Sequence, residues 1–396
     1  MLQVEEALAR MVGHAEPLGV ETVPTLHAHR RVLATDVVSA IAVPPLANSQ
    51  MDGYAVRTLD VPARGTTLRV SQRIPAGHVG TPLEPGTAAR IFTGAPVPPG
   101  ADAIVMQEGC TADGDRVTLN EVPERGAWIR PAGMDVEAGD VVVRASTRLR
   151  PQDLGLIASV GVAQVTVHRP LRVAVFFTGD ELAMPGEPLA PGRIYNSNRF
   201  VLRALLERLD CRVDDLGIVP DDRTRTRDTF VKASAAADLI ITSGGVSVGE
   251  EDHVKPAVES EGALDMWQVA MKPGKPLAFG HVRNVPFIGL PGNPVSSFVT
   301  FLLFARPFIL RRQGVLDVDY PVTTLRADFD WPRADKRREF LRVRRNERGG
   351  VDLFPVQNSA VLTSAAWADG LLDIPSGTTF TSGDNVRYVS FADLLG

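Results

Sequence analysis

The stretch that most constrains the fold is residues 238–252, where an apolar run ends in a glycine turn and an acidic segment follows. This pattern predicts a buried strand, a loop of free backbone amides and the first turn of a helix. Such a loop commonly binds phosphate, because its N–H groups and the helix dipole both face the anion. The three acids at 250–252 would repel a phosphate unless a cation lay between them, which suggests a phosphate bridged by magnesium. From this stretch alone, an ordinary strand–helix turn capped by Ser243 or Ser247 explains the residues equally well.

Strands and helices alternate on both sides of this stretch. The apolar run at 171–177 is continuous, as is typical of a buried parallel strand. Strands alternating with helices predict an open, mostly parallel sheet with right-handed crossovers. The expected strands are 171–177, 212–218, 238–242 and 285–290, the expected helices are 199–209, 230–237, 252–261 and 295–312, and a hairpin is expected at 266–270 and 276–280.

The sequence on either side of this α/β region has a different pattern. Residues 2–12 predict a short amphipathic helix, and residues 55–140 contain short β-like runs without helical periodicity. A helix at 152–160 and a strand at 163–167 lead into the α/β region. After residue 317 β patterning returns and resembles a small β-barrel. The predicted fold class is therefore α/β plus β, in several domains.

Composition narrows the classes of function. At 396 residues the chain is too long for one core, so about two to four domains are expected. The formal charge of −5 argues against nucleic-acid binding. Cys110 and Cys211 offer neither a disulfide framework nor a metal-ligand spacing, so a soluble protein in a reducing cytoplasm is expected. The first ten residues carry acids where a signal peptide has bases, and the apolar stretch 298–310 is too short to span a bilayer, so no membrane is expected.

Charged and glycine-containing turns follow the strands of the predicted sheet. In open α/β sheets, ligands bind beyond the carboxyl ends of the strands, so these turns are expected to meet. Acids, glycine turns and two lysines together are hard to explain as solvated surface, and they predict a site for a phosphorylated ligand and a divalent cation. The carboxylates are Asp180, Glu181, Asp221, Asp222 and Asp252; the glycine turns are Gly244-Gly245 and Pro291-Gly292-Asn293-Pro294; the lysines are Lys272 and Lys275.

Several common site types have no support in the sequence. There is no GxxxxGK[ST] and no GxGxxG motif, so ordinary ATP-binding and NAD-binding folds are not indicated. No nucleophilic triad is visible. His27 and His29 lie in a turn-rich region without a third metal ligand nearby, and a surface position explains them better.

Six motifs, in order along nearly the whole chain, resemble those of one known family. They are NSQMDGYAVR at 48–57, IFTGAPVPPGADA at 91–103, TGDEL at 178–182, SGGVSVG at 243–249, KPGKP at 272–276 and LPGNPVS at 290–296. The chain is thereby identified as similar to molybdopterin molybdenumtransferase, the molybdenum-insertase family called MoeA in bacteria and represented in animals by the C-terminal domain of gephyrin. The glycine-rich motif alone would not be specific, since molybdopterin adenylyltransferases and CinA-like proteins share that domain.

The resemblance implies a fold, a reaction and an assembly. It implies a central open α/β sheet like that of MogA, an N-terminal β domain, a small linker α+β domain and a C-terminal β-barrel. The expected boundaries are 1–50 with 141–169 (a dimerisation region), 51–140, 170–314 and 315–396. The expected protein is a homodimer whose site lies between the α/β domain of one subunit and the β domain of the other. There, adenylylated molybdopterin and molybdate would give molybdenum cofactor and AMP, with Mg²⁺.

The resemblance also assigns residues. The implied catalytic residues are Asp52, Asp135, Glu181, Asp221, Asp252, Lys272 and Lys275, and the implied metal ligands among them are Glu181, Asp221 and Asp252. The implied substrate-binding residues are Thr93, Gly94, Thr178, Gly179, Asp180, Asn196, Ser197, Asn198, Ser243, Gly244, Gly245, Val246, Ser247, Pro291, Gly292, Asn293 and Pro294. Arg338 and Ser364 match polar residues that the family links to oxyanion handling in the C-terminal domain.

The match is not complete, and alternatives of other classes stay open. Asn196 stands where Asp is also common, and Phe177 stands where a small hydroxyl residue is usual. A pterin-binding carrier or scaffold without turnover is one alternative, and a molybdopterin adenylyltransferase is another. Partners implied by the resemblance are a molybdopterin adenylyltransferase and the apo-molybdoenzymes that receive the cofactor. The sequence does not choose between molybdate and tungstate.

Overall fold

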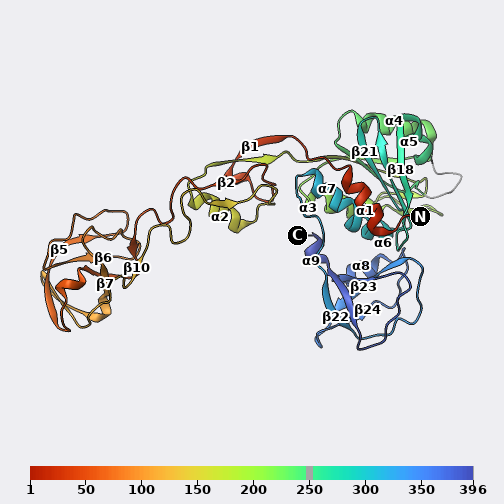
Figure 1. The fold of residues 1–396 in the computed structure, drawn as a ribbon. Helices are drawn as coiled ribbons and strands as arrows, with labels where there is room; N and C mark the ends of the chain where they lie inside the picture. Colours follow the sequence, from red (N-terminus) through yellow and green to blue (C-terminus); the bar gives the residue numbers. More distant parts are fainter. Residues whose placement is uncertain (247–252, 396) are drawn as a thin grey trace. The chain divides into compact units, whose positions relative to one another are not determined.

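The computed structural model describes residues 1–246 and 253–395 (Figure 1). These form two compact units. The larger unit comprises Met1–Glu21, Arg30–Ala34 and Thr166–Gly396, and the smaller unit comprises Thr22–His29 and Thr35–Val165. The four-domain division expected from the resemblance is finer than this, and it stays a prediction.

A six-stranded sheet forms the centre of the larger unit. Its order is β16 (Arg212–Val219), β13 (Arg172–Thr178), β17 (Leu239–Ser243), β21 (Val285–Leu290), β20 (Pro276–Val282) and β18 (Gly262–Gln268). The first four strands are parallel, and β20 and β18 add an antiparallel hairpin. The register pairs Phe177 with Ser243, Thr178 with Val219, and Ser243 with Leu290, so the parallel strands end at one edge.

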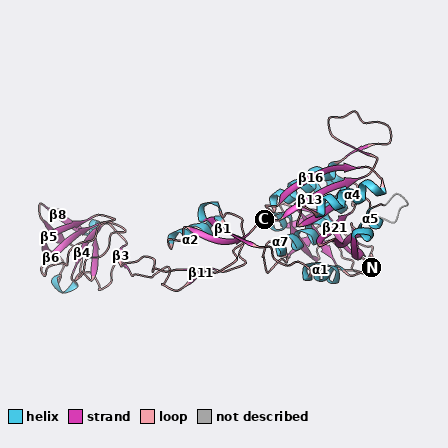
Figure 2. Cartoon of the chain, turned by 90° about the horizontal axis from the view of Figure 1, so that it is seen from above, coloured by secondary structure: helices cyan, strands magenta, loops and turns pink. Residues whose placement is uncertain are grey.

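Helices cover both faces of this sheet because its strands are apolar on both sides (Figures 1 and 2). On one face α4 (Arg223–Ser234) and α5 (Val254–Glu261) pack on a cluster in which Phe230 meets Phe176 and Phe287 edge-to-face, with ring centroids 5.0 and 5.1 Å apart. The other face packs on α3 (Ser197–Arg208), α6 (Pro294–Thr300) and α7 (Arg306–Arg312), together with α1 (Val4–Gly13). Two short strands, β14 (Leu182–Ala183) and β15 (Ile194–Tyr195), lie between β13 and α3.

The predicted helices differ from the observed ones at two places. The helix expected at 230–237 begins earlier, at Arg223, because the side chain of Asp222 caps it by accepting from the N–H of Arg225 (2.7 Å). The helix expected at 295–312 is continuous, but Phe301–Ala305 forms a π turn (η4) ahead of Pro307, which has no N–H to donate. By length and composition, Pro294–Arg312 is the one helix in the described ranges that could cross a membrane, yet 78% of its most apolar window is buried inside the protein.

A closed β-barrel follows. Strands β23 (Arg338–Arg345), β24 (Gly350–Leu353), β22 (Thr323–Ala327), β26 (Asn385–Ser390) and β25 (Gly370–Ile374) form a ring that the β23–β25 pairing closes. Two short helices accompany it, α8 (Leu362–Trp367) and α9 (Phe391–Leu395). The two-residue strand β19 (Met271–Lys272) pairs in parallel with the start of β23. This pairing joins the loop at residues 272–275, called the lysine loop because it carries Lys272 and Lys275, to the barrel.

The smaller unit is mostly β, as expected. Its six-stranded sheet has the order β7 (Ala103–Met106), β4 (Gly53–Val56), β6 (Thr87–Ile91), β5 (Thr66–Ile74), β9 (Arg116–Leu119) and β8 (Cys110–Asp113). Short strand pairs, β2 (Val37–Val38) with β11 (Val141–Val143) and β3 (Asn48–Ser49) with β10 (Ile129–Arg130), lie outside that sheet. The remaining elements up to residue 168 are β1 (Val20–Pro24), η1 (Thr25–His27), η2 (Thr58–Asp60), η3 (Gln107–Gly109), α2 (Pro151–Ser159) and β12 (Gln164–His168).

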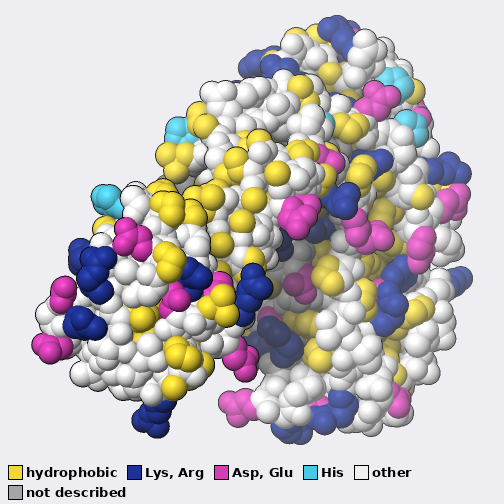
Figure 3. Space-filling view, turned by 60° about the vertical axis from the view of Figure 1, so that its left-hand side comes forward, with side chains coloured by type: hydrophobic (Ala, Val, Ile, Leu, Met, Phe, Trp, Pro, Cys, Tyr) yellow, Lys and Arg dark blue, Asp and Glu magenta, His cyan; other side chains and the backbone are white. Residues whose placement is uncertain are grey.

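Together these observations confirm the predicted fold class: an open α/β sheet flanked by β structure and a C-terminal barrel. On the face of the molecule shown in Figure 3, acidic and basic side chains are interspersed.

Candidate active site

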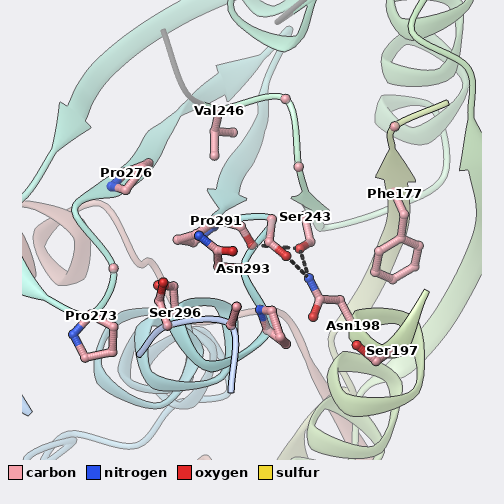
Figure 4. A pocket seen from close by; sticks show the side chains of 18 of the residues that line it. Phe177, Ser197, Asn198, Ser243, Val246, Pro273, Pro276, Pro291, Asn293 and Ser296 are labelled. Atoms are coloured by element: carbon pink, nitrogen blue, oxygen red, sulfur yellow. Dashed lines mark hydrogen bonds between the residues drawn. The ribbon is translucent and has the colours of Figure 1, made fainter. Parts of the chain in front are cut away.

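A cavity of about 1020 Å³ lies at the edge of the sheet where the parallel strands end (Figure 4). Its volume suits a ligand larger than a simple anion. Many of the residues predicted from strand ends and loops line it: Thr178, Gly179, Glu181, Asn196, Ser197, Asn198, Asp221, Ser243, Gly244, Gly245, Val246, Lys272, Lys275, Pro291, Gly292, Asn293 and Pro294. The prediction that these segments converge at one sheet edge is therefore confirmed by geometry, while their individual roles stay predictions.

The two glycine turns are tied together by buried hydrogen bonds. The Asn198 side-chain amide donates to Ser243 Oγ (2.9 Å) and to the Gly292 carbonyl (2.7 Å), and Ser243 Oγ donates to the Pro291 carbonyl (2.9 Å) (Figure 4). Asn198 thus donates both of its amide N–H groups, and Ser243 its hydroxyl, to other groups of the protein. These residues shape the pocket wall and have no side-chain donor left for a ligand.

The loop after β17 requires both of its glycines. Gly244 has φ +99° and Gly245 has φ +64°. A Cβ on Gly244 would lie 2.5 Å from the Thr178 carbonyl oxygen, and one on Gly245 would lie 2.6 Å from a Val254 methyl carbon. Bare backbone therefore faces the cavity, as the phosphate-cradle hypothesis expects. Two predicted residues of this motif, Ser247 and Asp252, lie outside the described residues, as do Glu250 and Glu251.

Two side-chain atoms beside this loop have unused hydrogen-bonding capacity. Thr178 Oγ1 and Asn196 Nδ2 are buried without a hydrogen-bond partner in the part of the chain that the structure describes. Asn196 Oδ1 caps α3 by accepting from the N–H of Arg199 (3.1 Å), which fixes the orientation of the amide. An unpaired buried polar group is costly, so these two groups at the cavity wall fit a ligand or water that would pair with them. Phe177, which stands where a small hydroxyl residue is usual in the family, also lines the cavity.

Acidic residues cluster at the ends of β13 and β16. The N–H of Asp180 donates to Asp221 Oδ2 (3.1 Å), and the N–H of Asp221 donates to Asp180 Oδ1 (3.2 Å). Partial burial raises the pKa of the Asp221 carboxyl, and the nearby charges of Asp180 and Glu181 raise it further. Glu181 and Asp221 line the cavity, whereas Asp180 does not. In the described ranges no group of three or more acidic, histidine or cysteine side chains is arranged to hold a metal ion by itself.

The two predicted lysines have different surroundings. Lys272 Nζ lies 2.9 Å from Oε1 of the buried Glu339 and 3.5 Å from Asp335 Oδ2. Lys275 has no ion pair with any residue of the described ranges. Between them Gly274 has φ +108°, and a Cβ there would lie 2.3 Å from Thr300 Oγ1, so the turn packs closely on α6. Both lysines line the cavity, but only Lys275 has an uncompensated charge there.

The barrel supplies cavity residues that the sequence did not indicate. Arg337, held by Asp335 (Nη2 to Oδ2, 2.9 Å), lines the cavity. So does the loop that contributes Gln357, Asn358, Ser359 and Ala360. No motif marked these residues. Their position at the cavity follows from the pairing of β19 with β23, and that pairing is a tertiary contact that no local sequence pattern indicates.

The structure places Arg338 and Ser364 outside the cavity lining. The Arg338 guanidinium pairs with Asp373 and Glu5, and its predicted role in oxyanion handling stays a prediction. Ser364 is fully buried and accepts from Arg342 Nε (3.1 Å). Burial lowers the pKa of Arg342 to about 10, and this arginine also donates to the carbonyl of Asn358 (3.3 Å). Ser364 therefore supports the cavity loop from behind.

The remaining predicted residues lie in the smaller unit. Asp52 Oδ1 accepts from the N–H of Thr93 (2.8 Å) and from its hydroxyl (2.9 Å). These two bonds hold the pKa of Asp52 below its ordinary value, and the charge of Arg90 contributes. Gly94 follows with φ +80°. Asp135 is exposed in the turn after β10, and its N–H donates to the Val43 carbonyl (3.0 Å).

An α/β domain with a glycine-loop cavity at its strand ends, joined to a closed barrel and a β unit, defines the class of protein. Residues 174–311 match the family model described as a probable molybdopterin binding domain. Residues 2–161 match the MoeA N-terminal region (domain I and II), and residues 324–391 match the MoeA C-terminal region (domain IV). The cavity therefore belongs to a domain of the molybdopterin-binding class.

Relatives along the whole chain identify the family. The chain is 39% identical to the molybdopterin molybdenumtransferase of Haemophilus influenzae, over 100% of both chains. It is 39% identical to molybdopterin molybdenumtransferase 2 of Mycobacterium tuberculosis, over 94% of both. It also resembles the crystal structure of the molybdopterin biosynthesis MoeA protein of Pyrococcus horikoshii, with a TM-score of 0.85, 29% identity, and coverage of 99% of this chain and 100% of that one. The chain belongs to the molybdopterin molybdenumtransferase (MoeA) family, which confirms the resemblance seen in its motifs.

Proposed function

We propose that this chain inserts molybdate into adenylylated molybdopterin and releases AMP, forming molybdenum cofactor. One observation carries the proposal: a single cavity brings together a bare glycine loop, two lysines, an arginine and acidic strand ends. Such a cavity offers donors for phosphate groups and carboxylates for a cation. The relatives named molybdopterin molybdenumtransferase support the same reaction.

The cavity has parts suited to each part of the substrates. The amides around Gly244 and Gly245 would bind a phosphate of the pterin nucleotide. Lys275, with its free charge, would bind the transferred oxyanion or the phosphoanhydride, together with Arg337 from the barrel. Lys272, already paired with Glu339, would contribute mainly by shaping the turn. In the reaction, water would attack the phosphoanhydride, so that the bond between the two phosphates breaks, AMP leaves and the pterin keeps one phosphate. Two Mo–S bonds would form to the dithiolene sulfurs as molybdate loses one oxygen, which leaves as water with the two thiol protons.

Magnesium fits the donors that the cavity presents. Glu181 and Asp221 are hard oxygen ligands of the kind Mg²⁺ prefers. Burial raises the pKa of Asp221, and the charges of Asp180 and Glu181 add to this; a bound cation would offset both effects. A bound Mg²⁺ would neutralise charge on the phosphoanhydride. Asp252, the third expected ligand, lies outside the described residues.

The smaller unit would supply the second half of the site. Asp52 is held ionised by Thr93, as a general base or an electrostatic group requires. Asp135 is exposed and available. The family resemblance favours a homodimer in which these residues complete the cavity of the partner subunit. A cytoplasmic location, with a molybdopterin adenylyltransferase and apo-molybdoenzymes as partners, also belongs to this proposal.

A reconstituted reaction tests the proposed function. Purified protein is mixed with adenylylated molybdopterin, Mg²⁺ and molybdate, and AMP and molybdenum cofactor are measured over time. Release of both products, dependent on molybdate and on the protein, is the expected result. Tungstate in place of molybdate measures the selectivity between these two tetrahedral anions.

The same experiment separates the alternatives. Tight binding of the pterin without AMP release above background would identify a carrier or scaffold and would refute the transferase. Formation of adenylylated molybdopterin from molybdopterin and ATP would identify an adenylyltransferase. The closed barrel and its Arg337 at the cavity favour the transferase, since they add an oxyanion-binding group to the nucleotide-binding domain.

A further inference from the structure

The turn that carries Asp52 is packed tightly against the sheet of the smaller unit. Asp52 immediately precedes β4, and its carbonyl accepts from the N–H of Gln107 (3.0 Å). A Cβ on Gly53 would lie 2.1 Å from the Val105 carbonyl oxygen, so only glycine allows this approach to β7. The backbone at the Asp52 carbonyl and at Gly53 is thus held by η3 and by strand β7.

Arg90, on the adjacent strand β6, bridges the two groups that flank Asp52. Its Nη1 donates to the Gly53 carbonyl (2.9 Å), and its Nη2 donates to the side-chain Oε1 of Gln107 (2.7 Å). Gly53 follows Asp52 in the chain, and the backbone N–H of Gln107 donates a hydrogen bond to the Asp52 carbonyl. A planar guanidinium can make both bonds at once, whereas an ammonium group cannot reproduce this fork.

Aromatic rings hold the Arg90 side chain in place. Its guanidinium carbon lies 5.1 Å from the ring centroid of Tyr54 and 4.6 Å from that of Phe92. Arg73 lies over the Phe92 ring as well, at 4.5 Å. These cation–π contacts reduce the freedom of a long side chain and so lower the entropic cost of its two hydrogen bonds.

The positive charge of Arg90 stabilises the ionised Asp52 carboxylate, in addition to the hydrogen bonds that hold the turn. It is the charged group that contributes to the lowered pKa of Asp52, after the two hydrogen bonds from Thr93. Glu108 accepts from the Gln107 side chain (3.2 Å), so Gln107 is held from both ends of its amide. Arg90 therefore contributes both hydrogen bonds and a favourable charge to the Asp52 turn.

From these contacts we infer that Arg90 is a positioning residue for Asp52: its fork to Gly53 and Gln107 sets the orientation of the Asp52 carboxylate. It acts through the turn and does not itself contact substrate. The inference deepens the proposed function and rests on it, because Asp52 matters for turnover only if that proposal holds.

The test compares three variants of the full-length protein. Arg90→Met removes fork and charge, Arg90→Lys keeps the charge without the fork, and Arg73→Met is the matched control. Arg73 lies over the same ring but, in the described contacts, has no hydrogen bond to the Asp52 turn. The first readout is hydrogen exchange at the Thr93 amide, which donates to Asp52 and needs no substrate. The second is kcat and KM for AMP release.

If Arg90 positions Asp52, Arg90→Met and Arg90→Lys both speed hydrogen exchange at the Thr93 amide. Both variants also lower kcat about tenfold, which is the usual cost of losing a hydrogen bond to a charged group. KM stays within about twofold of the wild-type value. Arg73→Met changes neither readout. Wild-type exchange and kcat in Arg90→Lys would overturn the inference, because the fork would then be unnecessary. So would an equal effect in Arg73→Met.

Two further outcomes keep the inference separate from folding and from the proposed function. If Arg90→Met does not fold, Gln107→Leu removes one acceptor of the fork at an exposed position and is expected to raise Thr93 exchange with a few-fold loss of kcat. Unchanged exchange in that variant would also contradict the inference. If wild-type protein releases no AMP, the proposed function fails, while the exchange measurement still decides whether Arg90 holds the turn.

Discussion

Asp52 and Asp221 are both predicted site carboxylates, and their surroundings shift their pKa values in opposite directions. Two hydrogen bonds from Thr93 hold the pKa of Asp52 below its ordinary value, and Arg90 adds to the effect. Burial raises the pKa of Asp221, and Asp180 and Glu181 add to that effect. The smaller unit therefore presents a carboxylate whose charge its own residues already stabilise. The larger unit presents one whose charge is destabilised.

This difference indicates different tasks. A carboxylate that already accepts from backbone and hydroxyl donors is oriented and ionised without a ligand, as suits a base or an electrostatic group. A carboxylate crowded by other acids gains most from a cation. The comparison predicts that Asp52 contributes to turnover and that Asp221 contributes through a metal ion.

Replacing Asp52 should have the largest effect. Asp52→Ala is expected to lower kcat by about a hundredfold or more, the usual contribution of a positioned acid–base group, with little change in pterin affinity. Asp52→Asn can still accept from Thr93 and is the matched control for geometry. An equal loss in both variants assigns the effect to the charge. A large fall in affinity, measured by pterin fluorescence, would instead make Asp52 a binding residue.

Replacing Asp221 should act through magnesium. Asp221→Asn is expected to weaken apparent Mg²⁺ affinity about 10- to 100-fold, as loss of a metal-site carboxylate commonly does. A Mg²⁺ titration of AMP release measures this. Asp222→Asn is the matched control, because the neighbouring Asp222 caps α4 and Asn caps equally well. An unchanged Mg²⁺ requirement in Asp221→Asn would remove Asp221 from the metal site and end the contrast with Asp52.

The lysines offer a smaller test of the same distinction between free and compensated charge. Lys275→Ala should weaken pterin binding about tenfold at low salt and less at high salt, because Lys275 has no ion pair with the residues that the structure describes. Lys272→Ala should cost less affinity, since Glu339 and Asp335 already compensate that charge. Titrations at two ionic strengths check both variants. A salt-independent loss in Lys275→Ala would point to a folding defect, and equal losses in both variants would contradict the distinction.

The sequence predicted the α/β half of the molecule well because local signals there coincide with the tertiary ones. Apolar runs, glycine turns and caps mark each strand end, and parallel strands must bring those ends to one edge. The meeting of Thr178, Asp221 and Ser243 around one cavity follows from that rule. The sequence does not predict the start of α4 at Arg223, because its first two turns are polar and only the cap residue Asp222 marks the beginning of the helix.

Other features depend on contacts that no local pattern reveals. Arg337 and Arg338 are adjacent in sequence, yet Arg337 lines the cavity and Arg338 pairs with Asp373. The second contact requires the pairing of β23 with β25, which carries Asp373. Ser364 is predicted to bind ligand; in the structure it accepts a hydrogen bond from Arg342 and does not line the cavity, and its role stays a prediction. The compensation of Lys272 by Glu339 requires the pairing of β19 with β23, which is a long-range event.

The last and smallest expected effect is on stability as pH falls, measured by thermal unfolding of the metal-free protein. The pKa of Asp221 in the folded protein lies above the ordinary value of 3.8, so the ionised carboxylate lowers the stability of the fold at higher pH. This stability is regained as the pH falls through the raised pKa and the carboxyl group takes up a proton. Asp52 has the opposite sign: its contribution is present above 3.8 and is lost as pH falls below it.

Asp221→Asn should therefore raise Tm at pH 7 by roughly a degree or two and leave it unchanged near pH 3. Asp52→Asn should lower Tm slightly at pH 7, and this difference should vanish under acid. Mg²⁺ should abolish the advantage of Asp221→Asn at pH 7, because the ion relieves in the wild type the repulsion that the substitution removes. Shifts of the same sign in the two variants would mean that the two carboxylates do not differ as their surroundings indicate.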